Sequence, residues 1–185
     1  MNMRNIAMIT SAFALTIGLT GCVSIPSWTV KPTDLKTQVQ ADSPFYNNIG
    51  IGKVTDETKI SVWSKSHSYG SVVVAIQKSL PSVGYLAPAG KTPSYMLDAT
   101  LLESETTGTC SGIFGPLVTM WFKPVTKIAV NYTLKDVSGE TEVYNKTVRS
   151  EGMGKDNMHS NAQINAARLN VQEFLDDITS AAQGK

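Results

Sequence analysis

Two cysteines and two histidines are the residues best suited to nucleophilic chemistry in this 185-residue chain. Cys110 would act as a nucleophile only if His67 or His159 lay within hydrogen-bond reach and lowered the pKa of its thiol. The sequence around it, Thr-Gly-Thr-Cys-Ser-Gly, matches no catalytic signature. A serine hydrolase is no better supported, because the chain has no Gly-x-Ser-x-Gly nucleophile elbow. We therefore predict that Cys110 is a structural or incidental thiol, that no residue is catalytic, and that the protein is not an enzyme.

Metal and phosphate sites are equally weakly indicated. Met153, Met158 and His159 are soft ligands of the kind that copper accepts. One histidine and two methionines near a turn are, however, common in proteins without a metal. The glycines at 108, 112 and 115 are not followed by the Gly-Lys-Ser/Thr sequence that ends a phosphate-binding loop. We expect no metal and no cofactor.

Composition and charge favour a single folded domain that does not bind nucleic acid. Apolar residues make up 42% of the chain and charged residues 17%, which favours one packed domain over disorder. Removing residues 1–21 takes away Arg4 and no acid, so the rest of the chain has a formal charge of zero. A neutral chain lacks the basic surface of nucleic-acid binders, and we expect no nucleic-acid partner.

The first 21 residues have the layout of an export signal. Residues 1–5 are short and polar with one positive charge at Arg4, and residues 6–19 are almost all apolar or small. That apolar stretch is roughly 14 residues long, which is shorter than the roughly 20 needed to span a bilayer as a helix. We therefore interpret it as a signal peptide and leave it out of the fold.

The sequence Leu-Thr-Gly-Cys at 19–22 resembles the lipobox of bacterial lipoproteins. The resemblance implies cleavage before Cys22, a diacylglyceryl thioether on its sulfur and an acyl chain on its freed amine. Several acyl chains hold a protein firmly on a membrane, at ~0.8 kcal/mol per buried methylene. With Cys22 modified in this way, Cys110 has no partner for an intramolecular disulfide.

The residues after the lipobox cysteine bear on which membrane holds the protein. Enteric bacteria retain lipoproteins at the inner membrane when an aspartate follows the cysteine, whereas this chain has Val23 and Ser24. For a Gram-negative source, the resemblance therefore implies the periplasmic face of the outer membrane. For a monoderm source, it implies the outside of the cell.

We divide the chain into three parts: a signal peptide at 1–21, a lipidated cysteine with a flexible tether at 22–47, and one periplasmic domain at 48–185. The tether is expected because its residues are rich in Ser, Thr, Pro, Gln and Lys without a sustained period. Trp28 and the cluster at 44–46 are where it would begin to dock. About 20 flexible residues have a root-mean-square reach of about 25 Å.

Apolar periodicity predicts the elements of the domain. Strands are expected at 49–54, 95–101, 128–134 and 141–148, and helices at 70–80 and 161–182. Residues 61–69 are expected to form a loop, and Pro81 to end the first helix. Ser160 and Gln163 fit a capping box at the start of the second helix.

This order of elements, strand-helix-strand-strand-strand-helix, predicts an α+β fold. We expect a mostly antiparallel sheet of about four strands with two helices on one face. The arrangement resembles the lipopolysaccharide-assembly lipoprotein and several other families of small outer-membrane lipoproteins. That resemblance rests on element order and apolar pattern, and it brings no site residues.

The segment at 112–124 is the strongest candidate for a binding site. It is apolar and aromatic, yet Gly115, Pro116 and Pro124 interrupt it in a way that a central strand tolerates poorly. In one interpretation residues 117–122 form a buried strand or core loop. In the other, part of the segment is exposed as a partner-binding patch or a membrane-dipping loop. The residues of that patch would be Ile113, Phe114, Met120, Trp121 and Phe122.

Together these features predict a lipid-anchored lipoprotein of the cell envelope. Its expected partners are a membrane, reached through the N-terminal lipid, and an envelope protein that it serves as a non-enzymatic accessory or assembly subunit. The alternative is a periplasmic binder of a small ligand or glycan, or an inhibitor of a cell-wall hydrolase.

Overall fold

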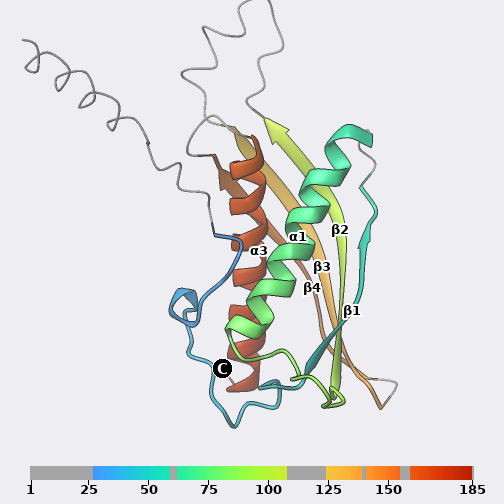
Figure 1. Ribbon diagram of the computed structural model, residues 1–185, viewed down its shortest axis with the longest axis vertical. Coiled ribbons are helices and arrows are strands. Elements are labelled where there is room, and N and C mark those ends of the chain that lie inside the picture. The colour runs from blue at the N-terminus through green and yellow to red at the C-terminus, as the bar shows by residue number, and fades with distance from the viewer. Residues whose placement is uncertain (1–26, 59–61, 108–123, 139–140, 155–158, 185) are drawn as a thin grey trace, which may run out of the picture.

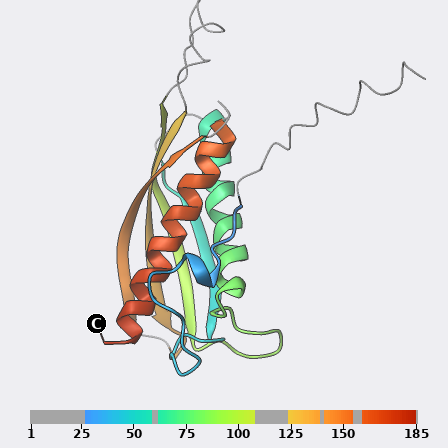
Figure 2. The ribbon, with the colours of Figure 1, turned by 90° about the vertical axis from the view of Figure 1, so that its left-hand side faces the viewer.

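The computed structural model describes residues 27–58, 62–107, 124–138, 141–154 and 159–184, and for 62–67 and 159 it describes the backbone alone. The elements follow in the order η1 (Pro32–Asp34), β1 (Ile49–Asp56), α1 (Val62–Ser82), β2 (Tyr95–Thr107), β3 (Val125–Asp136), β4 (Glu142–Met153) and α3 (His159–Ala182). Figures 1 and 2 show α1 and α3 on one face of the four-stranded sheet. The prediction of an α+β fold with a four-stranded sheet and two helices is confirmed.

The sheet is mixed, which corrects the expectation of a mostly antiparallel one. Its strand order is β1-β2-β3-β4, with β1 parallel to β2 and the other two pairs antiparallel. The parallel pair arises because α1 carries the chain from the end of β1 back to the level of its start, so that β2 runs in the same direction. The element order also differs from the expected one, because the 3-10 helix η1 precedes β1.

Helix α1 is longer than its apolar pattern predicts. It begins at Val62, so the expected loop at 61–69 is wrong from residue 62 on. Ser68 shows why the pattern misleads: its hydroxyl is buried and accepts a 2.7 Å hydrogen bond from Ser104 of β2. Pro81 lies inside the last turn, and Gly84 then takes the left-handed φ of +79° that reverses the chain.

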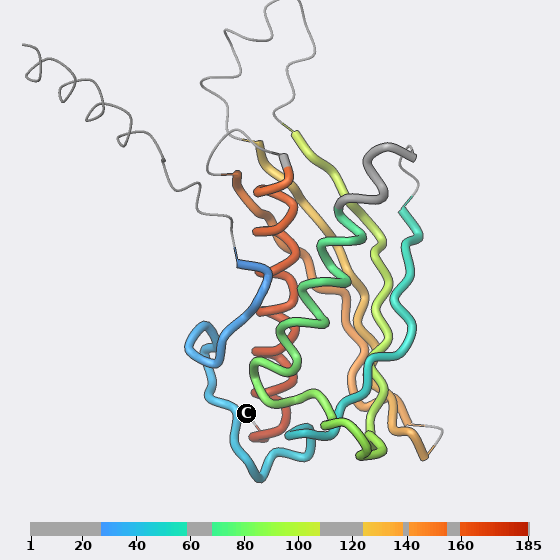
Figure 3. Tube along the Cα trace, viewed as in Figure 1, coloured from blue at the N-terminus to red at the C-terminus, as the bar shows by residue number. Residues whose placement is uncertain are grey.

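Helix α3 runs the length of the domain beside α1, on the same face of the sheet (Figure 3). It begins at His159, so Ser160 lies inside the helix and the expected capping box does not mark its start. The buried face of α3 includes Phe174, Leu175 and Ile178, as its period predicts. None of the helices in the described part of the chain is long and apolar enough to cross a membrane.

Aromatic rings fill the core near the C-terminal ends of the helices. Phe174 stacks on Tyr132 of β3 at 4.4 Å between ring centroids. Phe45 lies edge-on to Tyr95 at 5.1 Å and to Tyr85 at 6.4 Å. Because both Tyr85 and Tyr132 are fully buried, this end of the domain removes a large apolar area from water.

Residues 27–47 lie against the domain, which corrects the expected tether. Val30, Leu35 and Phe45 all belong to the hydrophobic core, and Val30 has no exposed surface. Polar composition suggested a free segment because these buried side chains are spaced too widely to form a recognisable period. We call residues 27–40 the strap.

Candidate functional site

The residues that the sequence singles out for function lie outside the described part of the chain. These are Cys22, Cys110 and the five patch residues Ile113, Phe114, Met120, Trp121 and Phe122. The ends of the apolar segment are nevertheless placed, because Thr107 pairs with Val125. Residues 108–123 therefore join the tips of β2 and β3, at the end of the sheet where both helices begin (Figure 1). Since β2 and β3 pair directly, no strand lies between them.

The face of the sheet turned away from the helices is polar, and we call it the open face. In β3 every second residue from Thr126 to Leu134 is buried towards the helices, and the residues between them point to the open face. Its polar residues include Thr55, Asp98, Thr100, Glu103, Glu105, Lys127, Asn131, Thr133, Lys135, Glu142, Asn145, Thr147, Arg149 and Glu151. Sequence analysis missed this surface, although the alternation of Lys127, Asn131 and Lys135 with apolar residues carries its signal.

A row of threonine and asparagine side chains crosses all four strands of the open face. Thr55 pairs with Thr100, Thr100 with Asn131 and Asn131 with Thr147. The hydroxyls of Thr55 and Thr100 lie 3.0 Å apart, and the Asn131 amide donates to Thr147 at 3.3 Å. Each such cross-strand pair stabilises the sheet by about 0.2–1 kcal/mol. The row is therefore a continuous but already paired set of donors and acceptors.

Charged residues on the open face form exposed ion pairs between strands. Lys135 lies 3.4 Å from Asp98, and Arg149 lies 3.4 Å from Glu103. Glu103 and Arg149 are the neighbours of Ala129 on the two adjacent strands. Ala129 faces the open side and is nevertheless fully buried. Exposed pairs of this kind contribute little to stability, ~0–1 kcal/mol. Lys127 lies 3.7 Å from Glu151, and with Glu105 and Glu142 the residues named on this face include more acids than bases.

One Tyr-Asp-Lys cluster joins β4 to α3. The Tyr144 hydroxyl donates to Asp177 at 3.0 Å, and the Lys146 ammonium donates to the same carboxylate oxygen at 2.8 Å. Burial and then the neighbouring Asp177 carboxylate raise the pKa of Tyr144. The hydrogen bond to Asp177 raises the pKa of Lys146. At neutral pH the tyrosine is thus neutral and the lysine charged, so neither is a base and the cluster acts as a clamp.

A small polar hollow lies between the C-terminal end of α3 and the chain around the end of the strap. Its cavity volume is about 80 Å³, and it is lined by Gln40, Asp42, Ser43, Thr179, Ala182 and Gln183. Small-molecule sites measure roughly 300–1,000 Å³, so this hollow is too small for one. Within the described ranges, no three His, Cys, Asp or Glu side chains are grouped to hold a metal ion.

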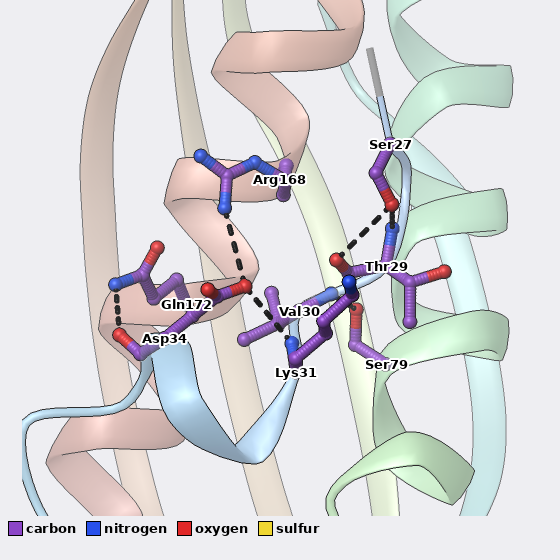
Figure 4. A network of polar contacts seen from close by, with 8 residues as sticks. All are labelled: Ser27, Thr29, Val30, Lys31, Asp34, Ser79, Arg168 and Gln172. Atoms are coloured by element: carbon purple, nitrogen blue, oxygen red, sulfur yellow. Dashed lines mark hydrogen bonds and ion pairs between the residues drawn. The ribbon is translucent and has the colours of Figure 1, made fainter.

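The strap lies over the two helices on the side away from the sheet (Figure 4). The Val30 amide donates to the Ser79 hydroxyl of α1 at 2.9 Å. On α3, Gln172 donates to the Asp34 carbonyl at 2.5 Å. The strap therefore bridges both helices through its own backbone.

Side chains add a second set of contacts between the strap and α3. Arg168 lies 3.5 Å from the Asp34 carboxylate, which also accepts from the Lys31 amide at 3.0 Å. Further along, the Lys36 amide donates to Asp176 at 2.7 Å. These contacts, together with the buried Val30, fix the chain from about residue 30 onward.

Comparisons with known proteins give likenesses of fold only. No protein-family model and no curated protein matches the chain. Among solved structures, protein XCC0632 of Xanthomonas campestris has a TM-score of 0.49 at 13% identity, covering 84% of this chain and 97% of that one. A PelC dodecamer of Paraburkholderia phytofirmans has a TM-score of 0.43 at 15% identity, covering 77% and 94%. Lipoprotein GNA1162 of Neisseria meningitidis has a TM-score of 0.42 at 13% identity, covering 72% and 98%.

Proposed function

We propose that the chain is a lipid-anchored lipoprotein of the bacterial envelope that serves a protein partner as a non-enzymatic accessory or assembly subunit. The observation that carries the proposal is the lipobox at 19–22, which stands in register with a short polar start and an apolar stretch. The strap, which packs on the domain, follows the lipobox closely in the sequence. Acyl chains on Cys22 therefore attach the domain to a membrane, and for a Gram-negative source this is the outer membrane at its periplasmic face.

The anchor is tested by mass spectrometry of the native protein purified from membranes. The N-terminal peptide is expected to begin at Cys22 and to carry the mass of a diacylglyceryl group and an amide-linked acyl chain. Cys22→Ser is the matched variant and is expected to lose the lipid and the cleavage together. An unmodified N-terminus, or an intact leader on the native protein, contradicts the proposal.

The apolar segment that joins β2 to β3 is the proposed partner site. Its ends, Thr107 and Pro124, lie at the tip of a long hairpin, where loops present binding residues on a rigid scaffold. Trp121→Ser combined with Phe122→Ser is expected to abolish capture of a stoichiometric partner from detergent-solubilised envelope while the domain stays folded. Val143→Ser is the control, because Val143 is an apolar residue of β4 that is 45% exposed.

The outcomes of this capture experiment separate the candidate functions. Capture that persists in the double variant rejects the segment as the partner site. Unfolding of the double variant assigns Trp121 and Phe122 to the core. Inhibition of a cell-wall hydrolase by the isolated wild-type protein favours the alternative, an inhibitor, over an assembly subunit.

A further inference from the structure

The strap shortens the length of chain between the anchor and the surface of the domain. Only residues 23–26 separate Cys22 from Ser27, where the strap begins. An extended chain spans at most ~3.6 Å per residue, so the Cys22 Cα lies within about 18 Å of Ser27 and about 29 Å of the fully buried Val30. A tether ending at residue 47 would have allowed several times that distance. If Cys22 is acylated, as proposed above, the domain is therefore held next to the bilayer.

The position of the strap decides which side of the domain faces the lipid. On α3, Arg168, Gln172 and Asp176 contact the strap, whereas Asn170 contacts the Val148 carbonyl of β4. The strap and the sheet thus lie on opposite sides of the helix layer, which Figure 4 also shows. Two packing distances of about 10 Å separate them, so about 20 Å of protein lies between the strap and the open face.

The chemistry of the strap suits a membrane interface. Trp28 is only partly buried, and tryptophan is enriched where headgroups meet acyl chains. Lys31 and Lys36 are exposed, whereas the single acid of the strap, Asp34, is held by Arg168. The outer surface of the strap is therefore net positive, as contact with anionic lipid headgroups requires.

We propose that the outer surface of the strap lies on the membrane interface and that the open face of the sheet points into the aqueous compartment. The proposal rests on acylation of Cys22, and its partner is a bilayer that contains anionic phospholipid. The short length of chain between Cys22 and the strap keeps the strap near the membrane surface, and Trp28, Lys31 and Lys36 orient it there. Measured from Val30, where the contacts with the helices begin, the chain reaches about 29 Å, and to lay the open face on the lipid it would have to cross the width of the helix layer as well as the about 20 Å of protein behind it.

The test measures the distance of two labelled sites from the lipid headgroups. Thr33 is exposed on η1 and Arg149 on the open face, at similar heights along α3. Thr33→Cys and Arg149→Cys, each in a Cys110→Ser background, are labelled with a fluorophore on the acylated protein in vesicles of phosphatidylethanolamine and phosphatidylglycerol. Energy transfer to headgroup-labelled lipid is expected to place position 33 closer than position 149 by about 20 Å. Equal distances, or a closer position 149, overturn the proposal.

Charge variants test how the strap is oriented. Lys31→Glu combined with Lys36→Glu is expected to shrink the difference between the two distances in vesicles that contain phosphatidylglycerol and to leave it unchanged in pure phosphatidylcholine. The matched control is Lys127→Glu combined with Lys135→Glu on the open face. This control is expected to leave the difference between the two distances unchanged in both kinds of vesicle. An effect of the control equal to that of the strap variant overturns the role of the strap lysines.

A release variant tests the strap itself. Val30→Asp is expected to free the strap and make the two distances converge. If circular dichroism shows that Val30→Asp unfolds, Ser79→Ala combined with Gln172→Ala removes two strap contacts without placing a charge in the core. Distances that stay apart after release show that the strap does not set the orientation. Mass spectrometry of the same sample distinguishes failure of the proposed orientation from failure of the proposed function. A lipidated Cys22 with equal distances overturns only the orientation. A missing lipid overturns both.

Discussion

The two ends of the domain reach close packing by different means. At the aromatic end, where the helices finish, Tyr85, Tyr132 and Phe174 are fully or almost fully buried. At the small-residue end, where the helices begin, Gly152 of β4 lies against Ala162 and Ala166 of α3. The first end gains stability from the apolar area it removes from water. The second end depends on how closely two backbones approach.

Polar groups sharpen this difference. At the small-residue end hydroxyls meet in pairs: the buried Ser68 and Ser104 at 2.7 Å, and the half-buried Thr106 with the buried Thr126 at 3.0 Å. The amide nitrogen of Asn161, in the first turn of α3, is buried and has no hydrogen-bond partner among the residues that the structure describes. A buried polar group costs free energy unless it is paired, so this end has less net stabilisation per residue. We therefore expect substitutions at the two ends to lower the free energy of unfolding for different physical reasons.

The largest effect is expected at the aromatic end. Phe174→Ala removes a ring that is 1% exposed and stacks on Tyr132, and it leaves a cavity between α3 and β3. The free energy of unfolding should fall by about 3–5 kcal/mol, measured by urea denaturation. Leu169→Ala is the control on the same helix, because Leu169 is 37% exposed, and it should change stability by less than about 0.5 kcal/mol. Similar losses from both variants would contradict an aromatic core.

The next effect belongs to the small-residue end. A Cβ at position 152 would meet backbone atoms of Ala162 and Ala166, which cannot rotate away as side chains do. Gly152→Ala should therefore lower the free energy of unfolding by about 3 kcal/mol, the upper part of the usual range for overpacking. Gly70→Ala in α1 is the matched control: its Cβ meets nothing within 4 Å, so it should be neutral or stabilise by up to about 1 kcal/mol. A tolerated Gly152→Ala would show that β4 can move away from α3.

The comparison between the ends also shows what the sequence could predict. All four strands and the long last helix follow from apolar periodicity, because each buries one face against the other layer. The start of α1 does not follow, since Ser68 reads as polar and only the structure shows its partner Ser104. The parallel pairing of β1 with β2 depends on the course of the chain through α1, which periodicity does not encode.

The candidate sites were harder to predict than the fold. Within the polar stretch of the strap, the apolar residues Val30, Leu35 and Val39 pack against the core, and the hydrogen bonds of the strap to Ser79 and Gln172 use backbone groups that every residue carries. No residue type signals such contacts. Cys22 is the opposite case: its proposed lipidation rests on a local motif that can be recognised without knowing the fold. The lipid on Cys22 and the partner site at 112–124 remain predictions from sequence.

The dependence of stability on alkaline pH offers a third way to distinguish the two ends. The three described tyrosines whose pKa values are raised all lie at the aromatic end. Burial raises the pKa of Tyr85, Tyr132 and Tyr144 above the ordinary value of 10.0. Above pH 10 the unfolded chain releases these protons and the folded chain keeps them, so stability is complete below pH 10 and falls as the pH rises. The fully buried Tyr132 alone should remove up to about 1.4 kcal/mol per pH unit.

The measurement is urea denaturation at several pH values from about 9 to 11. Tyr132→Phe should make the decline shallower, because one of the tyrosines no longer titrates on unfolding. The raised pKa of Lys146 acts in the same direction, since its pairing with Asp177 is lost as the lysine deprotonates. Constant stability over this range would show that the tyrosines are accessible to ionisation in the folded protein.

The smallest effect is expected from the hydroxyl pairs, and it is the most specific to the small-residue end. Ser104→Ala leaves the buried Ser68 hydroxyl without its donor and should cost about 1–2 kcal/mol. Replacing both serines with alanine removes the unpaired group as well, so the double variant should be more stable than either single one and close to the wild type. A thermodynamic cycle of the four proteins measures this coupling. Additive losses would mean that each hydroxyl has its own separate partner, and the small-residue end would then owe its stability to packing alone.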